Sequence, residues 1–145
     1  MSLDRAAVIR NAKQLAVSLG LDPKNVVLSA GSALVLMGLR KTTSDLDVDV
    51  PKEFFEKQKA RKGAKQGIIG EYVEWDGITD LHPILSESTV GKVTVDYEGV
   101  RVYHPEYLLA VKEVMVAHPD RQQDKAAQDR KDIKALKELL ERVEA

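Results

Sequence analysis

The chain has 145 residues and a mass of 16.1 kDa, which is the usual size of one domain with its own core. About 43% of its residues are hydrophobic and 31% are charged, a composition too apolar for a disordered chain. The net charge of −1 argues against a protein that coats nucleic acid nonspecifically. The absence of cysteine excludes a disulfide scaffold, a zinc finger and thiol catalysis. No apolar run approaches the roughly 20 residues needed to cross a bilayer, and the charged N-terminus does not resemble a signal peptide, so we expect a soluble cytoplasmic protein.

Hydrophobic spacing and turn residues predict a chain that begins with alternating helices and strands and ends with two helices. The predicted ranges are helix 2–19, strand 25–30, helix 33–39, strand 45–50, helix 51–62, a loop at 63–70, extended segments 71–75 and 78–81, a hairpin of 92–97 and 100–103, helix 105–117 and helix 121–143. This order predicts an α/β (α+β) fold, with one domain over residues 1–145, a small mixed sheet, helices packed on that sheet and two C-terminal helices.

The most informative segment is the predicted strand at 45–50, in which aspartates alternate with apolar residues. Asp45 and Asp47 point to the same side of a strand, with roots roughly 6–7 Å apart. Two carboxylates at this distance repel each other, and a divalent cation such as Mg²⁺ relieves the repulsion through oxygen ligands. A solvent-facing strand shows the same pattern without any metal. Asp49 shares the face, but we assign it to the start of the following helix, where a carboxylate stabilises the helix dipole.

A second feature, Gly31-Ser32, precedes Asp45 by fourteen residues and lies where the apolar strand is expected to meet a helix. Glycine allows a ligand to approach the backbone, and amides at a helix start together with the serine hydroxyl can bind phosphate. The alternative is a tight turn in which Ser32 only caps the helix. A phosphate-binding turn followed by a metal-binding strand predicts a combined nucleotide and metal site.

Residues 31–48, with the sequence GSALVLMGLRKTTSDLDV, resemble the signature of the nucleotidyltransferase superfamily with the DNA polymerase β-like fold. The resemblance covers residues 26–50 and is closest to minimal nucleotidyltransferases, including those of bacterial toxin–antitoxin and resistance systems. It implies that Asp45 and Asp47 bind two Mg²⁺ ions, that a later strand adds a third carboxylate, and that Gly31 and Ser32 hold a nucleoside triphosphate.

Several acids could supply the third carboxylate. We favour Asp80, in the extended segment Ile-Thr-Asp-Leu-His, which resembles an Asp-Leu-His run that follows the signature in some relatives. Glu74 and Asp76 are alternatives, although Asp76-Gly77 is typical of a hairpin turn. Asp96 lies on a later predicted strand and is a weaker candidate.

Two cations are candidates for contact with the triphosphate. Arg40, between the two halves of the motif, either binds the phosphates or is solvated. Lys112, in a position that resembles a family lysine, is expected to neutralise the triphosphate, with an exposed helical lysine as the alternative. The charged residues at 129–132 are expected to form structural ion pairs.

The remaining polar features favour plain structural roles. His82, His104 and His118 each precede a proline and have no metal-ligand spacing, so we interpret them as residues at element boundaries. Lysines and arginines outnumber acids between residues 52 and 65, which is typical of a solvated face, although such a run also attracts RNA.

Together these features predict a Mg²⁺-dependent nucleotidyltransferase that moves a nucleoside monophosphate from a nucleoside triphosphate to a hydroxyl acceptor. The acceptor could be a protein, an RNA or a small molecule, and either the two C-terminal helices or a partner subunit would form its groove. One alternative is a catalytically silent copy of the fold that acts as a partner-binding or antitoxin-like module. Another is a metal-dependent phosphohydrolase, which leaves the Gly-Ser turn unexplained.

Overall fold

The computed structural model of the chain describes residues 2–68, 70–84 and 93–144. Its helices are α1 (Arg5–Leu19), α2 (Ala30–Leu36), α3 (Lys52–Lys62), α5 (Pro105–Ala117) and α6 (Gln123–Glu144), with a short 3-10 turn, η1 (Pro23–Asn25). Its strands are β1 (Val27–Leu28), β2 (Leu46–Val50), β3 (Lys65–Gln66), β4 (Glu71–Glu74), β5 (Thr79–Pro83), β6 (Thr94–Tyr97) and β7 (Val100–Tyr103). Lys92, the expected first residue of the second hairpin, lies outside the described residues.

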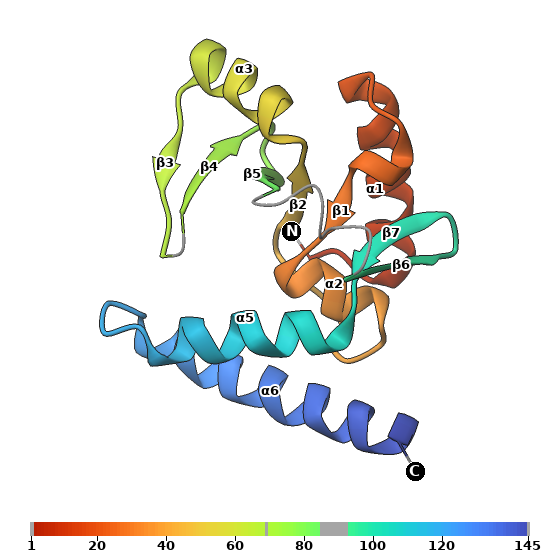
Figure 1. The fold of residues 1–145 in the computed structure, drawn as a ribbon, viewed down its shortest axis with the longest axis vertical. Helices are drawn as coiled ribbons and strands as arrows, with labels where there is room; N and C mark the ends of the chain where they lie inside the picture. Colours follow the sequence, from red (N-terminus) through yellow and green to blue (C-terminus); the bar gives the residue numbers. More distant parts are fainter. Residues whose placement is uncertain (1, 69, 85–92, 145) are drawn as a thin grey trace.

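The strands form one seven-stranded sheet in the order β3-β4-β5-β2-β1-β7-β6. Strand β2 pairs in parallel with β5 and antiparallel with β1, and β1 pairs in parallel with β7. The sheet is therefore mixed, and the predicted α+β fold with two C-terminal helices is confirmed (Figure 1).

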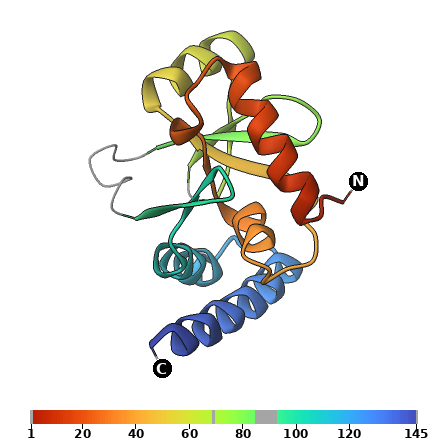
Figure 2. The same ribbon diagram turned by 90° about the vertical axis from the view of Figure 1, so that its right-hand side faces the viewer.

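Helix α1 packs against β2 and β7; it lies at the right in Figure 1 and in front of the strands in Figure 2. The apolar side chains of β2 are fully buried, as are those of Leu28 and Leu81 on neighbouring strands. The aspartates of β2 alternate with these residues and are only half-buried. Burial of the apolar residues fixes the strand's orientation, because a slip of one residue would turn the aspartates into the core.

Capping explains where several elements begin and end. The Asp4 carboxylate accepts a hydrogen bond from the Ala7 amide at the start of α1, and Gly20 ends the helix with a φ of +70°. Glu98 and Gly99 both have positive φ values, 52° and 81°, as a two-residue turn between β6 and β7 requires.

Two local expectations are wrong. Helix α2 begins at Ala30, so Gly31 and Ser32 lie in its first turn and not in a turn before it. The loop expected at 63–70 contains the short strand β3, which pairs with β4. Both residues of β3 are polar and exposed, so no hydrophobic pattern marks the strand.

Strand β7 leads into helix α5, and helices α5 and α6 form an antiparallel pair at one end of the molecule (Figures 1 and 2). The predicted ends of α5 are confirmed, and α6 begins two residues later than expected. None of the helices among the described residues is both long and apolar enough to cross a membrane.

Candidate active site

The pairing of β2 with β5 brings two of the predicted ligands together. Asp47 is in register with Asp80, and Asp49 is in register with His82. Partners in register on neighbouring strands lie about 4.8 Å apart and share a face of the sheet. The strand alternation places Asp45, directly before β2, on the side of Asp47. The backbone register thus brings Asp47 beside Asp80, 33 positions away in the chain, with Asp45 on the same face.

The electrostatic environment of Asp80 reflects this grouping. Burial, and after it the neighbouring carboxylates of Asp47 and Asp45, together raise the pKa of the Asp80 carboxyl to about 6. Ionised Asp80 is therefore disfavoured by its neighbours, and a bound cation would relieve that repulsion.

The other acids considered for the third position have different surroundings. Glu74 lies opposite Asp80 on β4, but its carboxylate pairs with the Lys65 ammonium at 2.8 Å. Asp76 accepts hydrogen bonds from two backbone amides in the turn between β4 and β5. Asp96 lies on the edge strand β6, 3.6 Å from the Arg101 guanidinium. Asp80 is the acid that the register places beside Asp47.

His82 also belongs to this face. It lies one residue before the end of β5, in agreement with its expected place at an element boundary, and its Nε2 is 3.1 Å from Oδ1 of Asp47. Burial lowers the pKa of His82, but the hydrogen bond to Asp47 and the charges of Asp47, Asp49 and Asp80 outweigh burial and raise it. The sequence contains one signal for this contact, because Asp80 and His82 are two residues apart and therefore point to the same side of a strand.

Asp49 also has a different position from the expected one. Its carboxylate accepts a hydrogen bond of 2.5 Å from the Tyr103 hydroxyl on β7, and it does not cap helix α3. Burial raises the pKa of Asp49 to about 6, although the hydrogen bond from Tyr103 and the charge of His82 oppose that rise. The Tyr103 ring stacks on Tyr107 of α5, with ring centroids 4.4 Å apart. Asp49 therefore connects the central strand to the start of the C-terminal helices.

Ser32 is fully buried, and its hydroxyl is used within the chain. It lies 2.8 Å from the Ser29 carbonyl oxygen and 2.9 Å from that of Asp47, and it accepts a hydrogen bond of 3.2 Å from the Asp47 amide. The hydroxyl thus holds the start of α2 against the strand that carries the carboxylates. A contact between Ser32 and phosphate stays a prediction.

Gly31 lies close to two side chains of the loop between α2 and β2. A Cβ atom on Gly31 would lie 2.6 Å from an Arg40 guanidinium nitrogen and 2.8 Å from Thr43 Oγ1. Both distances are shorter than real Cβ contacts, so an alanine would displace Arg40. In this structure the space beside Gly31 is filled by side chains of the protein.

Lys112 does not have the exposed position that triphosphate binding would need. Its ammonium is buried between helices α5 and α6, 2.9 Å from Asp129 and 3.1 Å from Asp132. The Arg121 guanidinium also pairs with Asp129, at 2.8 Å, and Arg40 lies 3.9 Å from Asp132. Hydrogen bonds from Arg121 and Lys112 outweigh burial and lower the pKa of Asp129. The expected structural ion pairs of residues 129–132 are confirmed for the two aspartates, and Lys112 belongs to them.

The donor set fits Mg²⁺ chemically, since Asp45, Asp47 and Asp80 supply carboxylate oxygens from one sheet face. The raised pKa of Asp80 shows that these carboxylates already influence one another. Among the described residues, no three His, Asp or Glu side chains converge closely enough to hold a metal ion as they stand. Side-chain rotation on a fixed backbone register would be needed to bind one.

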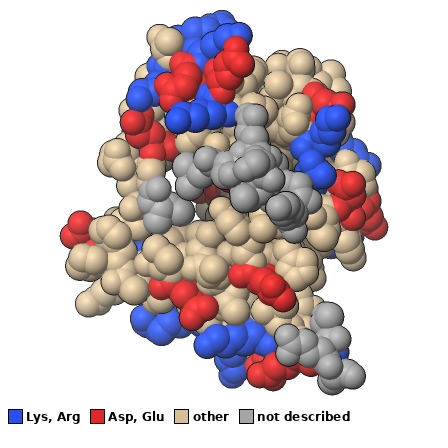
Figure 3. All heavy atoms as spheres, in the orientation of Figure 1, with Lys and Arg blue, Asp and Glu red and all other residues tan. Residues whose placement is uncertain are grey.

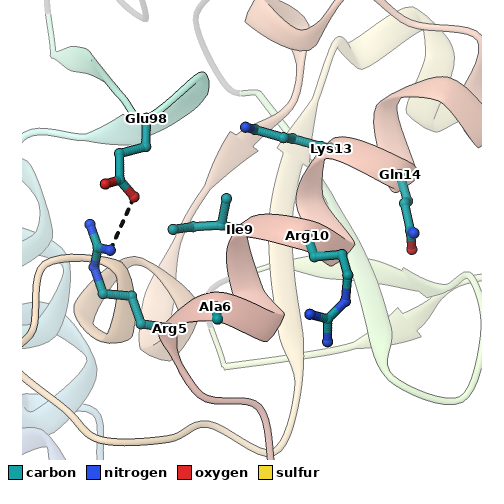
Figure 4. Close-up of a pocket in the computed structure, with 7 residues that line it drawn as sticks. All are labelled: Arg5, Ala6, Ile9, Arg10, Lys13, Gln14 and Glu98. Atoms are coloured by element: carbon teal, nitrogen blue, oxygen red, sulfur yellow. Dashed lines mark ion pairs between the residues drawn. The ribbon is translucent and has the colours of Figure 1, made fainter.

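Figure 3 shows Lys and Arg atoms gathered over α3 at the top of the view and over the helical pair at the bottom, with Asp and Glu atoms beside them in both places. An open hollow of about 710 Å³ lies on α1, between this helix and the turn that joins β6 to β7. Figure 4 shows its lining, in which Arg5 pairs with Glu98 at 3.0 Å while Arg10 and Lys13 extend from the helix. No carboxylate of the β2 and β5 face lines this hollow, so it is distinct from the candidate site.

Comparison with known proteins adds information on the fold. No family model matches the chain, and no curated protein matches it. Four chains of solved structures do match, and one of them is the Megavirus polyadenylate synthase. The chain has the same fold as part of that enzyme. The superposition has a TM-score of 0.55 at 15% identity and covers 88% of this chain and 30% of the viral chain. This protein therefore spans less than a third of its viral neighbour, and the likeness concerns the fold alone.

Proposed function

We propose that this protein is a Mg²⁺-dependent nucleotidyltransferase that transfers a nucleoside monophosphate from a nucleoside triphosphate to a hydroxyl acceptor. The observation that carries the proposal is the register of Asp47 with Asp80, with Asp45 on the same face. The fold that presents these acids is shared with a polyadenylate synthase, whose name describes nucleotide transfer.

In the proposed reaction, the acceptor oxygen forms a bond to the α-phosphorus and its hydroxyl proton passes to solvent. The bond from that phosphorus to the bridging oxygen breaks, and pyrophosphate leaves with the electron pair. Bound by Asp45, Asp47 and Asp80, two Mg²⁺ ions would stabilise the charge on the attacking and leaving oxygens. The contribution of this chain is positioning, since a packed parallel strand pair holds the carboxylates in a fixed register. The buried Ser32 hydroxyl fixes the strand of Asp47 to helix α2.

The site does not select one class of acceptor, because a protein, an RNA and a small molecule can each supply a hydroxyl. The basic run at 52–65 does not single out RNA, because several of its cations are already neutralised. The observed pairs are Lys57 with Glu53, Lys59 with Glu71 and Lys65 with Glu74. A partner subunit that completes the acceptor groove is compatible with the small size of the chain.

A catalytically silent, partner-binding copy of the fold is the second candidate. It is favoured by the burial of Lys112 in an internal ion-pair network and by the lack of a preformed three-ligand site among the described residues.

The experiment that separates these functions uses matched aspartate variants. Wild-type protein is incubated with Mg²⁺, each labelled nucleoside triphosphate and a cell extract, and the labelled macromolecules and small molecules are identified. Asp45→Asn, Asp47→Asn and Asp80→Asn should each lower transfer about a thousandfold or more, since a lost metal ligand removes several kcal/mol of transition-state stabilisation. Asp49→Asn is the control and should retain most activity, because the Asp49 carboxylate is bound to Tyr103.

Calorimetry of triphosphate binding gives an independent answer. We expect binding in Mg²⁺ or Mn²⁺ and its loss in chelator. Equal binding in both conditions would exclude the metal role, and absence of binding together with absence of transfer would favour the silent module.

A further inference from the structure

His82 contacts a predicted metal ligand from the neighbouring strand. Its side chain is 33% exposed and that of Asp47 is 19% exposed, so the hydrogen bond between them is only partly open to water. A carboxylate oxygen accepts hydrogen bonds, so the 3.1 Å contact requires the proton to be on Nε2 of His82. This hydrogen bond is made by Oδ1 of Asp47, and Oδ2 takes no part in it.

The position of the imidazole is itself fixed by its surroundings. The backbone of His82 is held in the β2–β5 ladder opposite Asp49. The ring of Tyr72, on β4, lies beside the imidazole, with its centroid 5.9 Å from that of His82. A ring held by strand pairing and by a packed aromatic neighbour loses little further conformational entropy when it orients a carboxylate.

We propose that His82 is a positioning residue, which donates its Nε2 hydrogen to Oδ1 of Asp47 and thereby holds the carboxylate in the rotamer that presents Oδ2 to Mg²⁺. This inference rests on the proposed function, since it assigns Asp47 as a ligand. Hydrogen bonds from outer partners to metal-binding carboxylates commonly change metal affinity by about ten- to a hundredfold.

The test is the affinity of the purified 145-residue chain for Mn²⁺, measured by electron paramagnetic resonance. His82→Phe keeps an aromatic ring beside Tyr72 but removes the donor, and we expect it to weaken Mn²⁺ binding about tenfold or more. His82→Gln places an amide donor near the position of Nε2 and should keep the affinity within about threefold of the wild type. Tyr72→Leu removes the neighbouring ring but keeps the donor on His82, and it should weaken Mn²⁺ binding less than His82→Phe does. Thermal unfolding of each variant shows which of them are folded.

A second measurement needs no variant. Long-range ¹H–¹⁵N spectra of the wild-type protein report which imidazole nitrogen carries the proton. We expect His82 to be protonated on Nε2 before and after Mg²⁺ is added, with a shift on addition that His104 and His118 do not show.

Four results would overturn the inference. The first is unchanged or tighter Mn²⁺ binding by folded His82→Phe, and the second is an equal loss of affinity in the phenylalanine and glutamine variants. The third is loss of the Nε2 proton when Mg²⁺ is added, and the fourth is the absence of metal binding by the wild type. The last result would also overturn the proposed function, whereas the first three leave metal binding by the carboxylates intact.

Discussion

Replacing Asp49 by asparagine should stabilise the protein at neutral pH, although it removes a hydrogen-bonded side chain from the middle of the sheet. The raised pKa of about 6, against an ordinary value of 3.8, means that the folded protein favours the neutral carboxyl. Asparagine is always neutral, has nearly the same shape and keeps an oxygen that accepts the hydrogen bond of the Tyr103 hydroxyl.

The size of the effect follows from the difference in pKa between the folded and unfolded states. Because the folded state binds the proton more tightly, the cost of ionising Asp49 is absent well below pH 3.8, grows through the interval up to pH 6 and is complete above it. The free energy of unfolding of Asp49→Asn should therefore exceed that of the wild type by about 3 kcal/mol near pH 7.5, and by only about 1 kcal/mol near pH 4.5.

Urea denaturation at the two pH values measures this difference. Asp80 titrates in the same interval, so the same substitution is made in an Asp80→Asn background as a control. A gain that is independent of pH, or a loss of stability near pH 7.5, would refute the reasoning. Either result would mean that Asp49 is held as a carboxylate and that the hydrogen bond from Tyr103 outweighs burial.

Two further predictions concern buried polar groups. Ser32→Ala should lower the free energy of unfolding by about 1–3 kcal/mol, because the amide of Asp47 loses its hydrogen-bond partner. Urea denaturation measures this loss. Unchanged stability together with weaker triphosphate binding would instead show that Ser32 binds phosphate. Lys112→Met should cost about 3–5 kcal/mol by leaving Asp129 and Asp132 buried with fewer cations. A folded Lys112→Met of wild-type stability that no longer binds triphosphate would show that the lysine serves the site.

Part of the candidate site can be predicted locally. The alternation of aspartates and apolar residues in β2 predicts a strand with one acidic face, because only one face of the strand can be buried. Gly20, the turn at Glu98-Gly99 and the proline at the start of α5 mark element ends through their own backbone preferences. Asp80 was favoured as the third acid from its extended context and from a resemblance, and its place beside Asp47 agrees with that choice.

The sequence by itself therefore determined the type and order of most elements and the acidic face of β2, since these depend on residues a few positions apart. Only the tertiary structure decided which distant side chains meet that face. Asp49 bonds to Tyr103 across 54 positions of the chain, and His82 meets Asp47 across 35. Lys112 is buried because α5 and α6 pack against each other, although the residue alone is typical of an exposed helix face. Such contacts depend on strand register and helix packing, which minimise the free energy of the whole core and leave no local pattern to detect.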